Sequence, residues 1–331
     1  MRLNACQNNS SIFKTPEDEA KYVAAYDAVL ALWPVPIESF DVPTRFGKTH
    51  IIASGPKEAL PLILLHATSA SATMWFPNIA DLTRDYRTYA LDTIGEPGKS
   101  VVSSLPQKKS DYVLWLTDVF NELNITEADV VGASYGGWVT MNLALYSPER
   151  VRKIVLLSPP AAFVPFNKMY MLRIIPSILF PIRFFINNSI RPLFVRRPNE
   201  IYLEQLALAA KCKFKEVFPT EFTDDELRQI KTPALLLIGE KEVILSAPKA
   251  IDRAKRLMQD IQAEIIPEAS HMLSMDQPEM VDARILKFLS NERGCMYNNI
   301  FTFLAVILVF VAGLLATFAW DILPRVNIRG D

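Results

Sequence analysis

At Val131-Gly132-Ala133-Ser134-Tyr135-Gly136-Gly137, a run of apolar residues gives way to small residues around one serine, and a new apolar segment begins at Trp138. This pattern predicts a buried strand, a sharp turn and a helix. The turn has the form G-x-S-x-G, in which strained backbone angles hold the serine hydroxyl clear of the chain. Because the helix starts directly behind Ser134, its unpaired N-terminal amides favour negative charge that develops there. The same pattern also occurs as an ordinary glycine turn, so its context has to decide between the two interpretations.

A serine hydroxyl is a weak nucleophile near neutral pH, so a catalytic serine needs a base, most often histidine. The chain has three histidines, His50, His66 and His271. Where an elbow serine stands on a mainly parallel sheet, the order along the chain is serine, acid, histidine, which excludes the two histidines before Ser134. His271 follows the last predicted strand, in a loop that can reach the serine. We therefore expect His271 to be the base.

The acid that orients this histidine is expected after the preceding strand, where the sequence reads Ile238-Gly239-Glu240-Lys241-Glu242-Val243. Glu242 is the preferred acid and Glu240 is the alternative. If neither residue is catalytic, this segment is an ordinary surface turn whose charges face water. A tetrahedral intermediate also needs amide donors for its oxyanion. One is expected from Tyr135, the residue after the serine, and another from the loop of small residues 66–71.

Strands and helices alternate along most of the chain, which is typical of a doubly wound, mainly parallel sheet with ligands at the carboxyl ends of its strands. Strands are predicted at 37–44 and 49–54, which form a hairpin, and at 60–65, 87–91, 128–131, 154–157, 234–238 and 263–266. Helices are predicted at 16–32, 74–82, 111–123, 138–146 and 280–289. The expected organisation is an N-terminal helical segment (1–36), an α/β core (37–158 and 232–291) and an inserted helical cap (159–231).

Within the predicted cap, the stretch from Pro160 to Asn199 carries basic residues and no acid, among many large apolar residues. One interpretation is a cap whose apolar face covers the active site. The other is a basic and apolar surface that rests on anionic lipid headgroups. The basic residues are Lys168, Arg173, Arg183, Arg191, Arg196 and Arg197.

These motifs together resemble the α/β-hydrolase superfamily, and within it the capped serine esterases. The resemblance covers about residues 45–290. Besides the elbow and His271, it rests on Leu64-Leu65-His66-Ala67 with Met74-Trp75, on Leu91-Asp92-Thr93-Ile94-Gly95-Glu96-Pro97-Gly98-Lys99-Ser100, and on Gly239 to Glu242.

The resemblance implies roles for five residues, and it implies a fold with an inserted cap. It implies that Ser134 is the nucleophile, His271 the base and Glu242 the acid. It also implies that the amides of Tyr135 and Thr68 bind the oxyanion. The chain departs from the family pattern at position 67, where alanine replaces the usual glycine, and at position 242, where aspartate is commoner.

The expected function is that of a serine hydrolase that acts on carboxylic esters through an acyl-enzyme on Ser134. A small-molecule ester is the expected substrate, and this mechanism needs no metal and no organic cofactor. The alternatives are a lactonase, an acyltransferase or a lipid acyl hydrolase with the same three residues, and a non-catalytic sensor that binds a ligand under the cap.

The length of 331 residues suits a single large α/β domain with an insertion, and one segment near residue 310 is exceptional in composition. A formal charge of −1 gives no general attraction to nucleic acid, and the three distant cysteines fit free thiols in a reducing compartment better than disulfides or a metal site. Residues 300–320 contain no charge and are long enough to cross a bilayer, between Tyr297 and Trp320 as interfacial anchors.

The N-terminal residues lack the apolar core of a signal peptide, so we expect one C-terminal transmembrane helix with the catalytic domain in the cytoplasm. A buried C-terminal helix is the alternative interpretation of residues 300–320, although such a helix normally has a polar face.

Overall fold

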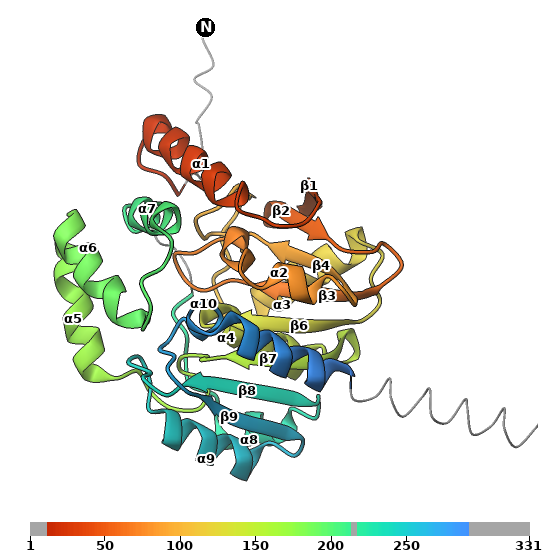
Figure 1. The fold of residues 1–331 in the computed structure, drawn as a ribbon. Helices are drawn as coiled ribbons and strands as arrows, with labels where there is room; N and C mark the ends of the chain where they lie inside the picture. Colours follow the sequence, from red (N-terminus) through yellow and green to blue (C-terminus); the bar gives the residue numbers. More distant parts are fainter. Residues whose placement is uncertain (1–11, 213–216, 291–331) are drawn as a thin grey trace, which may run out of the picture. The chain divides into compact units, whose positions relative to one another are not determined.

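The computed structural model describes residues 12–212 and 217–290. In these ranges the chain forms a nine-stranded sheet with the order β1-β2-β4-β3-β6-β7-β8-β9, and β5 pairs with β2 (Figure 1). Strands β3 to β9 that lie on this path run parallel, whereas β2 pairs antiparallel with β1, β4 and β5. The strands are β1 (Ile37–Thr44), β2 (Gly47–Ser54), β3 (Leu60–Leu65), β4 (Tyr86–Leu91), β5 (Val101–Val102), β6 (Ala128–Ala133), β7 (Val151–Leu157), β8 (Ala234–Gly239) and β9 (Ile261–Ile266). The predicted doubly wound, mainly parallel sheet is confirmed.

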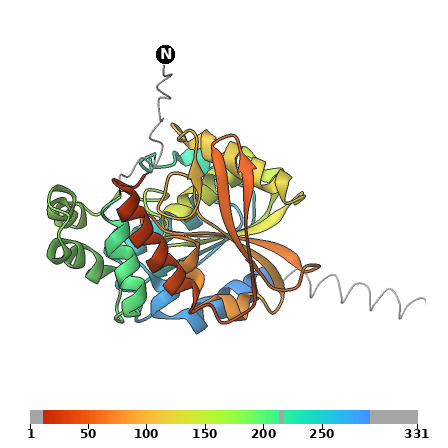
Figure 2. The same ribbon diagram turned by 90° about the horizontal axis from the view of Figure 1, so that it is seen from above.

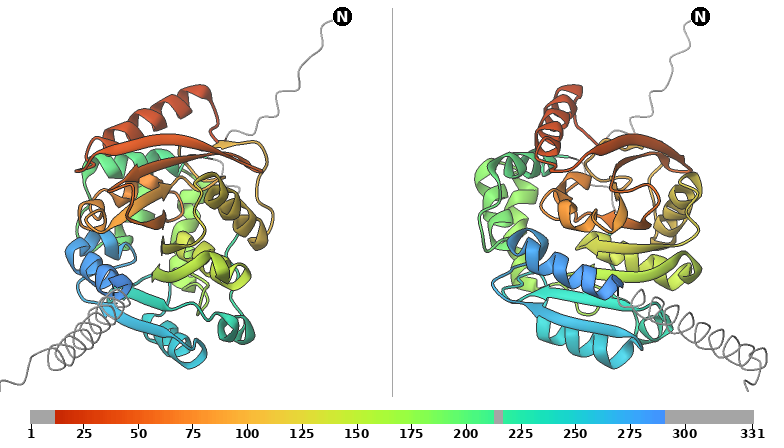
Figure 3. Two further views of the ribbon diagram at one scale, coloured as in Figure 1. Left: turned by 90° about the vertical axis from the view of Figure 1, so that its right-hand side faces the viewer. Right: turned by 45° about the vertical axis from the view of Figure 1, so that its right-hand side comes forward.

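The central strands are apolar without interruption because helices cover both faces of the sheet. On one face, Ile63 and Leu65 of β3 belong to a buried cluster with residues of α3 (Lys109–Glu122) and α4 (Tyr135–Tyr146). The alternate residues of β3 face the other way and are also fully buried. On that second face lie α2 (Ile79–Leu82) and the helix that begins at residue 278 (Figure 3). Helix α9 (Ala247–Leu257) covers the first face, together with α3 and α4 (Figure 3).

The predicted helix over residues 74–82 is wrong as a continuous element. The structure has a 3₁₀ turn, η1 (Ala72–Trp75), followed by the single turn of α2. Pro77 lies between them, and a proline ring in a helix interior removes one hydrogen bond and collides with the preceding turn. The break sets η1 against the core, where Trp75 is fully buried.

The N-terminal helix α1 (Pro16–Leu30) begins where Thr15 accepts a hydrogen bond from the amide of Asp18, with proline at the first helical position. It packs beside α7 (Glu200–Ala209) (Figure 2). Gln205 of α7 donates to the hydroxyl of Tyr22 at 3.3 Å and to that of Ser71 at 3.0 Å, so a buried polar network joins α1, α7 and the core.

Between β7 and β8 the chain leaves the sheet and forms α5 (Lys168–Leu179), α6 (Arg183–Ile190), the short turn η3 (Arg191–Leu193), α7 and α8 (Asp224–Gln229). Helices α5 and α6 pack against each other and project from the side of the sheet (Figures 1 and 2).

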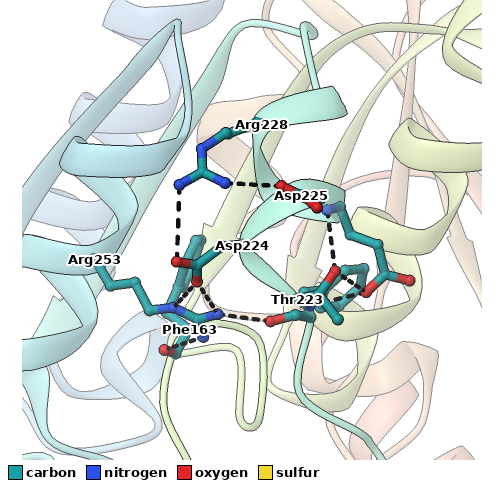
Figure 4. Close-up of polar contacts among 8 residues, drawn as sticks. Phe163, Thr223, Asp224, Asp225, Arg228 and Arg253 are labelled. Atoms are coloured by element: carbon teal, nitrogen blue, oxygen red, sulfur yellow. Dashed lines mark hydrogen bonds and ion pairs between the residues drawn. The ribbon is translucent and has the colours of Figure 1, made fainter.

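Arg253 of α9 ties the two ends of this insertion to the core (Figure 4). Its guanidinium donates to the carbonyl oxygens of Phe163 and Phe222, at 2.7 and 2.8 Å, and to the carboxylate of Asp224 at 2.7 Å. Phe163 follows β7, and Phe222 directly precedes the Thr223 cap of α8. The cap therefore leaves and rejoins the core at one clamped place.

In the part of the chain that the structure describes, no helix has both the length and the apolar character that a membrane span requires. The predicted transmembrane helix at residues 300–320 lies outside the described residues.

A buried carboxyl group lies between η1–α2 and the final helix. Asn78 donates a hydrogen bond to Oδ1 of Asp282 at 2.9 Å, whereas Oδ2 is buried and makes no hydrogen bond within the described ranges. Burial raises the pKa of Asp282 to about 8, against the opposing effect of the Asn78 hydrogen bond.

We predict that this carboxyl group makes the protein less stable as the pH rises. Its pKa in the folded chain lies above the ordinary value of 3.8, so its contribution to the free energy of unfolding is full below that value and is lost as the pH rises towards 8. Asp282→Asn keeps the shape and cannot ionise, so urea unfolding at pH 5 and pH 8 should show a smaller pH dependence for this variant. Glu122→Gln, at an exposed position of α3 far from Asp282 in the chain, is the control, and equal pH dependences for the wild type and Asp282→Asn would contradict the prediction.

Candidate active site

Ser134 stands between the end of β6 and the start of α4, with backbone angles φ 49° and ψ −116° that are strained for a residue with a side chain. Such a turn requires strand and helix to approach very closely. A Cβ atom on Gly132 would lie 2.3 Å from the carbonyl oxygen of Gly136, and one on Gly136 would lie 2.3 Å from that of Leu65. Only glycine fits these two positions, so the local sequence forces the serine outward.

Three predicted site residues meet at the carboxyl end of the sheet. Nε2 of His271 lies 2.8 Å from Oγ of Ser134, and Nδ1 lies 2.9 Å from Oε2 and 3.1 Å from Oε1 of Glu242. The side chains of His271 and Glu242 are only 2% and 1% exposed. Because a carboxylate only accepts, Nδ1 of the imidazole carries the proton and Nε2 is the acceptor for the serine hydroxyl.

Glu240, the alternative acid, lies on the same turn but away from the histidine. Its carboxylate accepts a hydrogen bond from the amide of Glu268 at 3.1 Å, on the exposed side of the loop. The side chain that contacts His271 is that of Glu242.

The Glu242 carboxylate is buried and yet remains ionised. Burial acts to raise its pKa. Several contacts lower the pKa by a larger amount: the attraction of His271, a hydrogen bond from the imidazole, one from the amide of Ile244 at 2.7 Å, and the nearby Ser158 hydroxyl. The Ser158 hydroxyl makes no hydrogen bond of regular geometry within the described residues, so its effect comes from proximity. The net result is a pKa below the ordinary value of 4.5.

The loop that contains Thr68 is held by two side chains whose part in the site the sequence analysis did not identify. The amide of Thr93 donates to Nε2 of His66 at 2.9 Å, which leaves Nδ1 to donate to the carbonyl oxygen of Ala67 at 2.8 Å. Glu96, also buried, accepts a hydrogen bond from the amide of Ser69 at 2.9 Å.

These contacts determine how the Thr68 amide points. The carbonyl of Ala67 and the N–H of Thr68 belong to one planar trans peptide and point in opposite directions, so fixing one fixes the other. Ser69 has φ 62°, a conformation in which a non-glycine residue needs such support.

A cavity of about 550 Å³ opens over Ser134 and His271. Its walls come from the Thr68 loop on the core side and mainly from apolar side chains of the cap. Cys212 also lines it, and burial raises the pKa of this thiol to about 12, so it stays protonated. Cap residues on the wall include Phe166, Tyr170, Met171, Ile174, Ile178 and Phe218.

Comparison with known proteins identifies the family of this chain. Residues 62–284 match the model of the Alpha/beta hydrolase family. Two proteins of Bacillus subtilis are similar over nearly their whole length: an uncharacterized carboxylesterase, nap, is 41% identical, with 87% of this chain and 98% of that protein covered. The carboxylesterase YbfK is 40% identical, with 85% of this chain and 97% of that protein covered.

Two solved structures from the same organism have the same fold. The crystal structure of naproxen esterase (carboxylesterase NP) has a TM-score of 0.78 at 38% identity, over 84% of this chain and all (100%) of that one. That of carboxylesterase CesB (YbfK) has a TM-score of 0.79 at 38% identity, over 83% and 99%. The family predicted from the sequence motifs is therefore confirmed, and the chain belongs to the α/β-hydrolase family, among its carboxylesterases.

Proposed function

We propose that the protein hydrolyses carboxylic esters through an acyl-enzyme formed on Ser134, with His271 as the base and Glu242 as the acid that orients it. The observation that carries this proposal is the unbroken line of hydrogen bonds from the Glu242 carboxylate through His271 to the Ser134 hydroxyl, at the wall of a cavity. The lowered pKa of Glu242 supports its role as the ionised acid, and the hydrogen bond from Nδ1 leaves Nε2 of His271 to face the serine.

In this mechanism the Ser134 oxygen attacks the ester carbonyl while its proton passes to Nε2 of His271. The Glu242 carboxylate stabilises the imidazolium that results, and because it is buried and ionised it does so without solvent screening. The imidazolium then protonates the departing alcohol, and the ester carbon remains bonded to Ser134. A water molecule then attacks the acyl carbon while one of its protons passes to His271. The bond to Ser134 breaks, the imidazolium returns the proton to the serine oxygen, and the carboxylic acid is released.

The oxyanion of each tetrahedral intermediate is assigned to the amides of Tyr135 and Thr68. The Tyr135 amide belongs to the first residue of α4, where the helix dipole favours negative charge. The Thr68 amide depends on its loop, so we assign His66 and Glu96 as positioning residues that hold this loop in the reactive conformation.

The substrates we propose are esters with a large apolar group. A cavity of this volume encloses a drug-sized molecule, and its cap side is built from aromatic and aliphatic side chains. One similar protein of known structure is a naproxen esterase, and its name agrees with a bulky apolar substrate.

We also propose, from the sequence, that residues 300–320 anchor the protein in a membrane with the catalytic domain on the cytoplasmic side. The segment carries 21 residues without a charge, and a helix of this length crosses the hydrocarbon layer. The thiol of Cys212 is free, which suits a reducing compartment.

We predict that each member of the proposed triad is needed for ester hydrolysis. Ser134→Ala and His271→Ala should each lower kcat for p-nitrophenyl esters by roughly a thousandfold or more, because either change removes the activated nucleophile. Glu242→Gln should lower kcat by about a hundredfold or more, whereas Glu240→Gln, the matched control two residues away, should change it less than about threefold. Circular dichroism checks that each variant is folded. A silent Glu242→Gln beside a crippled Glu240→Gln would overturn the assignment of the acid.

The second prediction tests the support of the Thr68 loop. Glu96→Ala removes the acceptor for the Ser69 amide, and the loss of one oxyanion donor costs about a hundredfold in kcat. Because this loss falls on the transition state, kcat should fall far more than KM rises. Glu96→Gln keeps a carbonyl acceptor at the same place and should restore most of the activity. If Glu96→Ala raised KM alone, the residue would line the substrate site and not position the loop.

The third prediction tests the anchor. Val311→Arg with Leu314→Arg places two charges at the centre of the apolar segment, each costing about 3 kcal/mol there, so the protein should move from the alkali-washed membrane fraction to the supernatant. Asn299→Arg with Asn327→Arg adds the same charge outside the segment and should leave the distribution unchanged. If the unmodified full-length chain is released by alkaline carbonate, the anchor does not exist. For the topology, an N-terminal epitope in sealed cells should resist external protease.

A further inference from the structure

Large apolar side chains on the described surface gather on one element of the cap. Eight of them lie within residues 169–184, that is, on α5, on the turn after it and at the start of α6, and their exposed fractions run from 43% to 73%. A monomeric protein rarely exposes a contiguous apolar patch of this size without a use for it. The residues of this hairpin patch are Met169, Leu172, Ile175, Ile178, Leu179, Phe180, Ile182 and Phe184.

The hairpin that carries the patch is braced and does not depend on a partner for its form. Tyr170 donates to the carbonyl oxygen of Ser189 at 3.2 Å, and Arg173 donates to the carbonyl and side-chain oxygens of Asn188 at 2.9 and 3.0 Å. Figures 1 and 2 show α5 and α6 standing out together from the body. The patch is thus presented on a preformed, protruding element.

The cap segment that carries the patch, residues 160–199, contains basic residues and no acid. Arg183 and Arg197 pair with Glu204 and Glu200 of α7, whereas the partners of the Arg173 guanidinium among the described residues are two uncharged oxygens of Asn188. Arg191 likewise donates to a carbonyl oxygen. For Lys168 and Arg196, no acid lies within ion-pair distance among the described residues. Cations without an acidic partner among the described residues therefore lie on the same cap segment as the exposed apolar side chains.

We propose that the α5–α6 hairpin docks on an anionic lipid surface, with its apolar side chains at the level of the acyl chains and its cations against the headgroups. Apolar residues combined with lysine and arginine are what the interface of such a membrane recognises. A second copy of this chain is a poorer occupant, because a twofold contact through this face sets the same cations against each other.

The patch also continues into the cavity. Ile178 is 69% exposed and Phe218 is 60% exposed, yet both side chains line the cavity that contains Ser134 and His271. An apolar ester dissolved in the lipid could pass along these side chains to the serine without crossing water. This consequence rests on the proposed function, whereas the docking itself does not.

The test uses one reporter tryptophan at the patch of the full-length chain. Trp33, Trp75, Trp115 and Trp138 are at most 8% exposed, so Phe184→Trp, together with Trp320→Phe, gives a surface reporter. Lipids with brominated acyl chains quench a tryptophan only where it contacts them. Val101→Trp in the same background is the matched control, because Val101 is 56% exposed and belongs to β5, outside the patch.

Vesicles of brominated phosphatidylcholine, with and without a third of brominated phosphatidylglycerol, should give clearly different results. We expect quenching at position 184 with the anionic vesicles, much less with the neutral ones, and none at position 101. Lys168→Gln with Arg196→Gln should weaken the docking of the hairpin, measured as quenching at position 184 and not as overall binding of the full-length chain, about fivefold per residue at physiological ionic strength. Neither residue lines the cavity, so hydrolysis of a short soluble ester should be unchanged. The same measurements on a Ser134→Ala chain separate docking from catalysis.

Three results would overturn the proposal. Equal quenching by neutral and anionic vesicles, unaffected by the two charge substitutions, would show that headgroup charge has no part. Absence of quenching together with a dimer that dissociates on Phe184→Gln would identify a second copy as the occupant. The third result is no quenching of the full-length chain but quenching of a chain without residues 295–331. That result would identify the C-terminal segment of the chain as the occupant of the patch.

Discussion

The active-site turn depends on two backbone contacts that are too close for any residue except glycine. At Gly132 of β6, a Cβ would lie 2.3 Å from the carbonyl oxygen of Gly136 in α4. At Gly136, a Cβ would lie 2.3 Å from the carbonyl oxygen of Leu65 in β3. Ser134 lies between these two glycines and has a positive φ. Because β6 pairs with β3 and β7, this close approach is fixed by the middle of the sheet and not by a loop. The strain at Ser134 is therefore supported by an extensive cluster of buried apolar side chains, which includes Tyr135 next to it.

Around this fixed point, burial and hydrogen bonding act in opposite directions on each charged group, and the balance differs from group to group. At Glu242, the histidine and an amide outweigh burial, so the carboxylate is ionised next to the imidazole. At Asp282, one amide donor does not outweigh burial, so the carboxyl group holds its proton to about pH 8. At Cys212, burial and the nearby carboxylates of Glu96 and Asp18 all raise the pKa, so the thiol stays protonated although it lines the same cavity as Ser134. The proposed chemistry is thereby confined to one nucleophile.

The sequence carried the part of this account that depends on local pattern and chain order. The form of the elbow indicated Ser134, and the position of His271 after the last strand indicated which histidine would reach it. It could not choose between Glu240 and Glu242 from spacing, because both follow β8 on one turn and only contact with His271 distinguishes them. His66 was excluded as a base by chain order, but its bond to the Thr93 amide lies between segments far apart in the sequence and was not predictable. The break at Pro77 was predictable from the sequence, because proline interrupts a helix interior. In the cap, Ile178 is both exposed and a cavity wall, a dual position that no helical periodicity reveals.

The claim at the centre of this account is that one serine forms the covalent intermediate. A p-nitrophenyl phosphonate ester reports on it directly, because its attack by the nucleophile releases one coloured phenol and leaves a stable adduct in place of the tetrahedral intermediate. The account predicts release of about one phenol per chain in step with the loss of esterase activity, and an adduct that peptide mass spectrometry finds on Ser134 alone. Full esterase activity in a chain that has been stoichiometrically modified, or an adduct on a different residue that accompanies the loss of activity, would contradict it.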